Sequence, residues 1–231
     1  MAIEKKVEAP LYYFSRMDKP DKLSKFAEAS KIDPLLLEKA REIYEKREHP
    51  RNAVFIAIIV TGFEYFSANE NGDAFFEEIM GEYVRPEDTL PVAYSTFTGK
   101  PVNRYHQSSG ENSNIGKIHF AYYNENQHRV EIVCELYWDK APTECLKIKR
   151  NVALNMSMCC KTSVDYCSFC GNAADTLDNH CDHVKYSLTD LIEGVPIFMI
   201  NKPDFSEASI VIIGGDPSAK VVYTVNSKLN S

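Results

Sequence analysis

The spacing of hydrophobic residues changes near residue 50 and divides the chain into a short helical part and a long part rich in strands. Before that point, apolar residues recur every three or four positions from Leu36 to Tyr44. Asp33 can cap this segment, and Pro34 suits its first turn. The pattern predicts one helix that ends at His49-Pro50. Residues 1–30 are polar and mixed, so we expect loops there.

After residue 50 the pattern is typical of β-strands. Residues 53–63 (AVFIAIIVTGF) are rich in β-branched side chains and predict a buried strand. Residues 115–123 and 129–138 flank a polar turn and predict a β-hairpin. Further elements are expected as follows: strand and loop at 92–99 and 100–105, strands at 152–158 and 208–213, a short helix at 74–83 capped by Asp73, and a helix at 141–151.

Many strands with few helices predict an α+β fold whose mainly antiparallel β core is decorated by helices. The 231 residues suffice for one substantial domain, and a hydrophobic content of 44% supports a real core. We therefore expect residues 1–50 to form an N-terminal extension with one helix, and residues 51–231 to form the core domain.

Charge and hydropathy exclude several classes of protein. The net charge is −7 and no basic block is present, which argues against a nucleic-acid surface. The longest apolar run, Ala53–Gly62, is too short to cross a bilayer. The first residues, MAIEKKVEAPLYYF, lack the apolar segment of a secretory signal, so we expect neither a membrane span nor export.

The densest chemistry lies between Asn155 and His183, which hold five of the seven cysteines and two of the six histidines. A Cys-x-x-Cys pair followed by glycine has the shape of a zinc knuckle, and a Cys-x-His pair ten residues later supplies a second half. The expected zinc ligands are Cys167, Cys170, Cys181 and His183, with Cys160 or His180 as alternatives for the fourth position. Four protein ligands leave no open position for water, which favours a structural role for the metal.

The cysteine cluster, and Ser157 with His106, each have an alternative interpretation. The cysteines could be buried or redox-active without a metal, although the added Cys-x-His pair favours zinc. Ser157, just before the cluster, and His106, upstream of it, could each be an ordinary hydrogen-bonded polar residue, as we expect for His119 and His128. A serine is nucleophilic only when a base accepts its proton and a third group orients that base.

Four sequence blocks in a fixed order help to decide whether Ser157 is a nucleophile or an ordinary polar residue. Residues 71–75 (NGDAF) form a Gly-Asp turn, and residues 100–118 contain Lys-Pro-Val, His106 and Ile-Gly-Lys-Ile. Residues 155–158 (NMSM) contain Ser157, and residues 205–219 contain FSEASIV and DPSA. Together, over about residues 54–222, these blocks resemble the prohead (head maturation) serine proteases of tailed bacteriophages, which are related in fold to herpesvirus assemblins. The resemblance implies a herpesvirus-protease-like barrel.

The resemblance also implies roles for individual residues. Ser157 would be the nucleophile, His106 the general base and then acid, and Glu207 the residue that orients the histidine; Asp204 or Asp182 could replace Glu207. The backbone amides of Met158 and Cys159 are candidates for an oxyanion hole. Cys159 stands where the family has a glycine, which would reduce activity if that glycine permits an unusual backbone conformation.

The spacing of these residues fits an insertion. His106 and Ser157 are 51 residues apart, about as in the family, whereas Ser157 and Glu207 are 50 apart, which is longer than usual. The excess is close to the length of the cysteine-rich segment. We therefore expect a zinc-binding insert at about residues 159–184, ordered by its metal.

The implied function is a serine endopeptidase that processes scaffold and major capsid proteins inside an immature phage head in the host cytoplasm. Its own N-terminal segment would be a further substrate. Related folds often work as dimers, which makes a homodimer an option, although no residue identifies an interface. The main alternative is a non-catalytic, zinc-stabilised capsid or assembly protein that keeps the fold. A weaker one is a host-side zinc-binding regulatory module.

Overall fold

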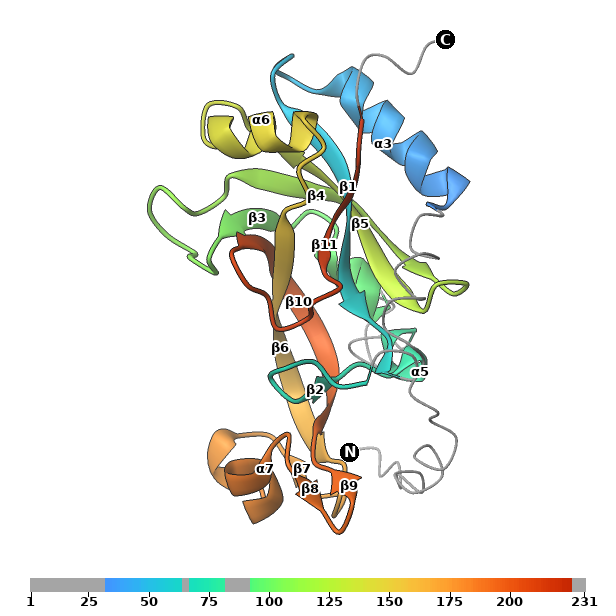
Figure 1. Cartoon of the computed structure of the whole chain (residues 1–231), viewed down its shortest axis with the longest axis vertical. Coiled ribbons are helices and arrows are strands. Elements are labelled where there is room, and N and C mark those ends of the chain that lie inside the picture. Colours follow the sequence, from blue (N-terminus) through green and yellow to red (C-terminus); the bar gives the residue numbers. More distant parts are fainter. Residues whose placement is uncertain (1–31, 64–66, 82–91, 226–231) are drawn as a thin grey trace.

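The computed structural model describes residues 32–63, 67–81 and 92–225 (Figure 1). The loops expected at residues 1–30 lie outside these ranges, as does the end of the helix expected at 74–83. Within them, four α-helices surround a mainly β core, which confirms the predicted α+β class. None of the helices in the described ranges is both long and apolar enough to span a membrane.

The helices are α3 (Pro34–Lys46), α5 (Glu77–Met80), α6 (Pro142–Lys149) and α7 (Asp182–Ser187), with 3-10 helices η1 (Ala93–Phe97) and η2 (Leu177–Asn179). The longer strands are β1 (Ala53–Thr61), β3 (Pro101–Arg104), β4 (Gly116–Asn124), β5 (Arg129–Leu136), β6 (Asn155–Cys167), β10 (Met199–Val211) and β11 (Lys220–Thr224). Four two-residue strands complete the set: β2 (Asp73–Ala74), β7 (Ala173–Ala174), β8 (Leu191–Ile192) and β9 (Val195–Pro196).

Seven strands close into a barrel. Neighbouring strands pair in the order β10-β3-β4-β5-β1-β11-β6, and a further pairing of β6 with β10 completes the ring. Every pair in the ring is antiparallel except β3–β10, which is parallel. The expected mainly antiparallel β core is therefore a closed barrel, in which β11 meets β6 only at Asn155.

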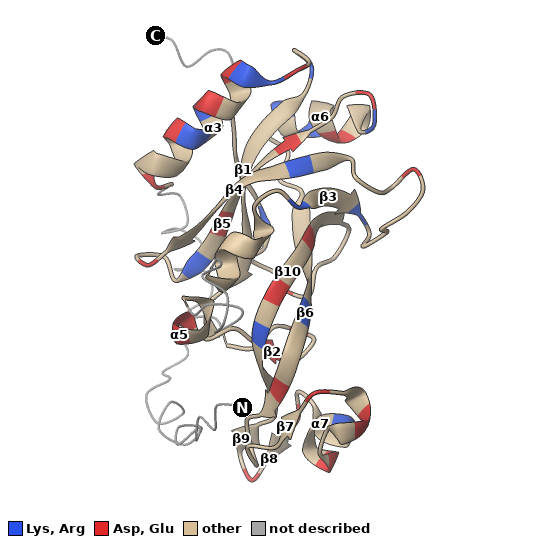
Figure 2. Cartoon of the chain, turned by 180° about the vertical axis from the view of Figure 1, so that it is seen from behind, with Lys and Arg blue, Asp and Glu red and all other residues tan. Residues whose placement is uncertain are grey.

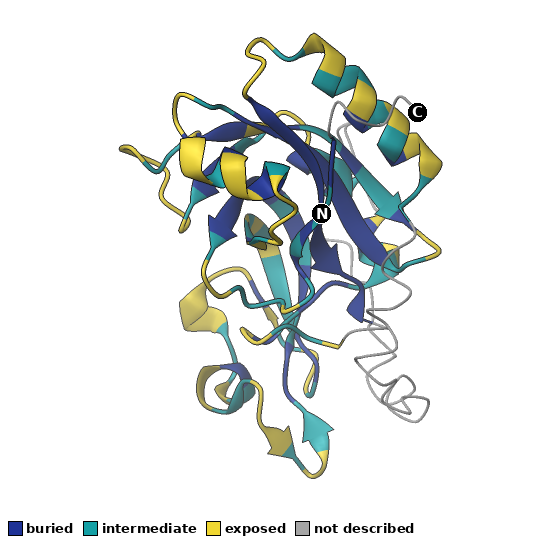
Figure 3. Cartoon of the chain, turned by 45° about the horizontal axis from the view of Figure 1, so that its top comes forward, coloured by how far each residue is buried: buried dark blue, intermediate teal, exposed yellow. Residues whose placement is uncertain are grey.

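The alternation of side chains along β1 explains how the barrel and α3 pack together. Phe55 and Ile59 belong to the apolar cluster inside the barrel, whereas Val54 and Ile56 point outward and pack with Leu36 of α3. Both faces of β1 are consequently buried, as Figure 3 shows by the dark colour of the barrel strands. The helix begins as predicted, because the Asp33 side chain accepts a hydrogen bond from the Leu35 N–H at 2.8 Å.

Strands β6 and β10 continue beyond the barrel as a two-stranded ribbon (Figure 1). Their register runs from Asn155 opposite Val211 to Cys167 opposite Met199. Residues 168–198 form the end of this ribbon, and we call them the tip. The sequence placed the start of the insert near residue 159, but β6 extends to Cys167, and the strands expected at 152–158 and 208–213 are the barrel ends of much longer ones.

Two smaller expectations were wrong. Asp73 does not cap a helix, because it lies in β2; α5 starts four residues later, after Phe76. Residues 93–97 form the 3-10 helix η1 instead of a strand, and the Ser95 and Thr96 hydroxyls bond carbonyl oxygens three residues back. Such local bonds compete with strand pairing.

Candidate active site and metal cluster

Ser157, His106 and Glu207 form one continuous chain of hydrogen bonds. His106 Nε2 lies 3.0 Å from Ser157 Oγ, and His106 Nδ1 lies 2.6 Å from Glu207 Oε1. The histidine side chain is 41% exposed, whereas the glutamate side chain is 9% exposed. A partly exposed serine, a histidine and a buried carboxylate in this order have the geometry that nucleophilic catalysis requires.

The pairing of barrel strands brings these residues together. Ser157 on β6 lies opposite Ser209 on β10, and Glu207 comes two residues before Ser209, on the same face of that strand. His106 lies in the turn after β3, which runs parallel to β10 with Arg104 opposite Ile210. Two sequence separations of about 50 residues thus become contacts between neighbouring strands.

Glu207 has three hydrogen-bonding partners that stabilise its charged form. Burial would raise the pKa of this carboxyl, but hydrogen bonds from His106, Asn103 and Ser209 lower it below its usual value. An ionised carboxylate at Nδ1 requires the ring proton there, which leaves Nε2 free to accept the Ser157 hydroxyl proton. Neither Asp204 nor Asp182 takes this place, since Glu207 occupies Nδ1.

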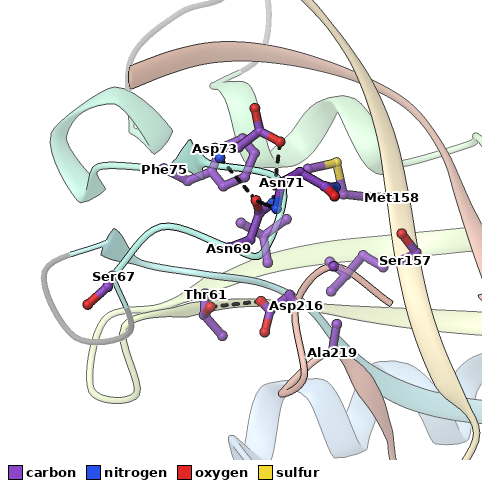
Figure 4. Close-up of a pocket in the computed structure, with 13 residues that line it drawn as sticks. Thr61, Ser67, Asn69, Asn71, Asp73, Phe75, Ser157, Met158, Asp216 and Ala219 are labelled. Carbon is purple, nitrogen blue, oxygen red and sulfur yellow. Dashed lines mark hydrogen bonds between the residues drawn. The ribbon is translucent and has the colours of Figure 1, made fainter. Parts of the chain in front are cut away.

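A small pocket and a larger groove adjoin the site. The pocket, of about 30 Å³, lies between β6 and the turn at residues 69–73, with Ser157 and Met158 on one wall and Asp216 on another (Figure 4). The groove, of about 540 Å³, is lined by His106, Cys159, Ser206, Lys117 and Tyr137, among others. The groove therefore provides space beside His106 and Cys159, whereas the pocket at Ser157 has room only for water-sized groups.

The two amides considered for an oxyanion hole differ in direction. Met156 donates its N–H to Ala219 O, away from β10. Because alternate amides of a strand point to opposite sides, Met158 N–H also points away from β10 and Cys159 N–H points toward it. Met158 is thus the better placed donor. Cys159 lies within β6 and is not among the residues with positive φ, so its backbone does not require glycine.

The four expected metal ligands lie together at the tip. The ligand atoms of Cys167, Cys170, Cys181 and His183 are all within 4.8 Å of one another, a spacing that could hold a metal ion. The Cys170 and Cys181 sulfurs are 3.5 Å apart, and all seven cysteines are free thiols. His183 Nδ1 is buried without a hydrogen-bond partner, an arrangement that a bound ion would explain.

The alternative fourth ligands have other surroundings. Cys160 packs against the barrel core, and His180 Nε2 lies 3.2 Å from Asp165 Oδ2. Burial would raise the pKa of the Cys181 thiol, but hydrogen bonds from Val184 N–H and from the neighbouring cysteine and histidine side chains lower it to about 7. A thiol that ionises readily is suited to metal ligation.

Two further histidines have structural partners. His119 Nε2 lies 3.1 Å from Glu135 Oε2, and His128 Nδ1 pairs with Glu77. Both therefore fit the expectation that they are ordinary hydrogen-bonded polar residues.

In comparisons with known proteins, no family model, no curated protein and no solved structure matches the chain. Function is therefore inferred from the geometry of these residues and from the resemblance of the sequence blocks.

Proposed function

We propose that this protein is a serine endopeptidase. The observation that carries the proposal is the hydrogen-bonded chain from Glu207 through His106 to Ser157, with distances of 2.6 and 3.0 Å. Ser157 Oγ would attack a peptide carbonyl while His106 Nε2 accepts its proton. His106 would then give that proton to the leaving amine, and water would hydrolyse the acyl-enzyme with His106 again acting as base.

Peptides are the substrate class that the surroundings of Ser157 favour. Among the described residues, no strand pairs with the outer edge of β6 between Asn155 and Asp165. Backbone groups on such an edge can hydrogen-bond an extended chain. Met158 N–H on this edge would face the oxyanion that forms during attack on the carbonyl.

The biological setting is proposed from the resemblance to prohead proteases. Scaffold and major capsid proteins inside an immature phage head would be the substrates, together with the N-terminal segment of this chain, which lies outside the described residues. Acidic and basic residues are interspersed along α3, and the charged residues of β10 are one lysine and two acids, so neither element supports a nucleic-acid partner (Figure 2).

We further propose that the cluster at the tip binds structural zinc. Three cysteines and one histidine fill a tetrahedral site and leave no position for a catalytic water. Ser157 and Cys167 lie ten residues apart on β6, which is about 33 Å of strand at roughly 3.3 Å per residue. A metal at the tip would be too distant to polarise the scissile carbonyl, so its role would be to order residues 168–198.

The test compares wild type with Ser157→Ala and Ser163→Ala. Ser163 is an exposed serine on the same strand and serves as the matched control. Each protein is incubated with capsid and scaffold precursors, and cut sites, including those in its own N-terminal segment, are mapped by mass spectrometry. We expect the same cuts from wild type and Ser163→Ala and none from Ser157→Ala. Equal cutting by all three would exclude a serine protease, whereas no cutting by any would favour the non-catalytic assembly protein.

A further inference from the structure

Ser209 connects the two residues that would activate Ser157. Its side chain is fully buried on β10, directly opposite Ser157 in the β6–β10 ladder. Its hydroxyl accepts a hydrogen bond from the His106 backbone N–H at 3.1 Å and donates one to Glu207 Oε2 at 3.0 Å. One hydroxyl thus contacts the backbone of the histidine and the carboxylate that orients its ring.

Asn103, on the neighbouring strand β3, hydrogen-bonds the same oxygen of the Glu207 carboxylate. Its side chain is 3% exposed, and its Nδ2 donates to Glu207 Oε2. Its Oδ1 accepts the backbone N–H of Asn114, which fixes which end of the amide faces the carboxylate. With Oε2 occupied by two donors, Oε1 is the oxygen left for His106.

The backbone at His106 shows why such support is needed. Tyr105 and His106 have φ angles of 53° and 58°, in the left-handed region. For residues other than glycine this conformation is strained and persists only where the surroundings enforce it. Here the bond from His106 N–H to Ser209 and the bond from Tyr105 N–H to Ile210 O tie the turn to β10.

We propose that Ser209 and Asn103 are positioning residues for the Ser157 site. Asn103 fixes the rotation of the Glu207 carboxylate, and Ser209 fixes both that carboxylate and the strained turn that presents His106. The hydrogen bonds of both side chains go to Glu207 and to the backbones of His106 and Asn114, so each acts through Glu207 or His106. This inference rests on the proposed function, because positioning has a kinetic meaning only if Ser157 is a nucleophile.

The experiment measures the rate at which a fluorophosphonate probe labels Ser157. In that reaction Oγ forms a bond to phosphorus, fluoride leaves, and the serine proton passes to His106, so the rate reports activation of the serine without a natural substrate. Ser209→Ala removes both hydroxyl contacts, and Ser209→Thr keeps the hydroxyl. Asn103→Asp keeps the acceptor for Asn114 N–H but replaces the donor to Glu207 with a like charge.

Ser168→Ala is the matched control. Ser168 is also fully buried, donates to Pro196 O at 3.2 Å and accepts Phe198 N–H at 3.0 Å, but it lies at the tip. We expect Ser209→Ala and Asn103→Asp to label about 10- to 100-fold more slowly than wild type, the usual effect of a small displacement of catalytic groups. Ser209→Thr and Ser168→Ala should label at nearly the wild-type rate. Thermal unfolding identifies any variant that is not folded; if Ser209→Ala is not, Asn103→Asp decides.

Labelling of Ser209→Ala and Asn103→Asp within about twofold of wild type would overturn the inference and leave the proposed function intact. A wild type that does not label, like Ser157→Ala, would overturn both. A second readout is the proton resonance of His106 Nδ1–H, followed by NMR in the Ser157→Ala background. Loss or marked upfield movement of this resonance on adding Ser209→Ala supports positioning, and an unchanged resonance contradicts it.

Discussion

The two ends of the β6–β10 ribbon are built from different interactions. At the barrel end, both strands are part of a closed ring around a continuous apolar core. At the tip (residues 168–198), only Ser168, Ala174, Val184, Ile197 and Phe198 are buried. Leu177 and Tyr186 are about 80% exposed, and much of the tip is exposed (Figure 3). The tip contains the Cys3His cluster, whereas the barrel contains an apolar core.

This difference explains why the candidate chemistry lies at the barrel end. A catalytic arrangement needs side chains held to within a fraction of an ångström, and neighbouring barrel strands provide that rigidity for Ser157, His106 and Glu207. The tip buries little apolar surface, so the proposed zinc would order it through ligand bonds.

Removal of the proposed zinc ion should have the largest effect, and only at the tip. Zinc contributes about 10–16 kcal/mol of apparent binding energy in small zinc-ordered peptides. Treatment with a chelator, or Cys181→Ser, should abolish amide protection over residues 168–198 while β1 and β5 keep theirs, as measured by hydrogen exchange. Cys159→Ser, at an exposed cysteine outside the cluster, is the control. A metal-free protein with a protected tip would contradict this prediction.

Replacement of Glu207, at the barrel end, should lower the rate of cleavage. Glu207→Gln keeps the shape but removes the charge that holds the Nδ1 proton, and the corresponding change in a serine protease lowers kcat roughly 10⁴-fold. Glu135→Gln is the control, because Glu135 is likewise buried and contacts His119 and Asn52. We expect the control to lose stability but to keep its rate of cleavage. Equal loss of rate in both variants would assign the effect to folding.

Truncating a side chain in the barrel core should lower the free energy of unfolding far more than truncating one at the tip. Phe97 is fully buried and stacks on Phe205, with ring centroids 4.0 Å apart. Phe97→Ala should lower the free energy of unfolding by about 3–5 kcal/mol. Leu177→Ala, at a residue 80% exposed on the tip, should change it by less than about 0.5 kcal/mol. Denaturant titration gives both values, and a large effect of Leu177→Ala would indicate that the tip has a core of its own.

The pH dependence of stability should show the smallest effect. The pKa of Glu207 is lower in the folded chain than its ordinary value, which is about 4.3. Its ionised form therefore stabilises the fold fully above that ordinary value, and this contribution is lost as pH falls through the lowered folded pKa. The difference in free energy of unfolding between wild type and Glu207→Gln should shrink below about pH 4. A difference constant from pH 2 to pH 7 would show that the carboxylate charge contributes nothing.

Regular local patterns were enough to predict much of the fold. The helix from Pro34, the buried strand from Ala53 and the hairpin around residues 124–128 all follow from spacing and turn residues, and all are present. The ribbon was underestimated because the predicted strand was ended where the cysteine-rich segment begins, although Met156, Met158, Cys160, Val164 and Tyr166 continue to alternate with more polar residues along β6. The strand β11 was not expected at all.

The two candidate sites also differ in how much of each the sequence could predict. Ligand types and their short spacing pointed to the metal cluster directly, because Cys-x-x-Cys and Cys-x-His place their ligands together whatever surrounds them. Only the tertiary structure favours His183 over Cys160 and His180 as the fourth ligand, because all three lie near the cluster in sequence. Asn103 and Ser209 were missed as site residues, and only the two-residue separation of Ser209 from Glu207 on one strand could have suggested a shared face.

The amino-acid sequence alone establishes the residue types: a serine, a histidine and a glutamate about 50 residues apart, and a compact set of thiols and imidazole. It establishes the second set as a cluster, since those residues are joined by short segments of chain. The contact of Ser157 with His106 and Glu207 depends on closure of the barrel, which makes β3, β10 and β6 neighbours. Long-range strand pairing is a property of the whole fold, because each strand is held in place by its neighbours and not by its own residues.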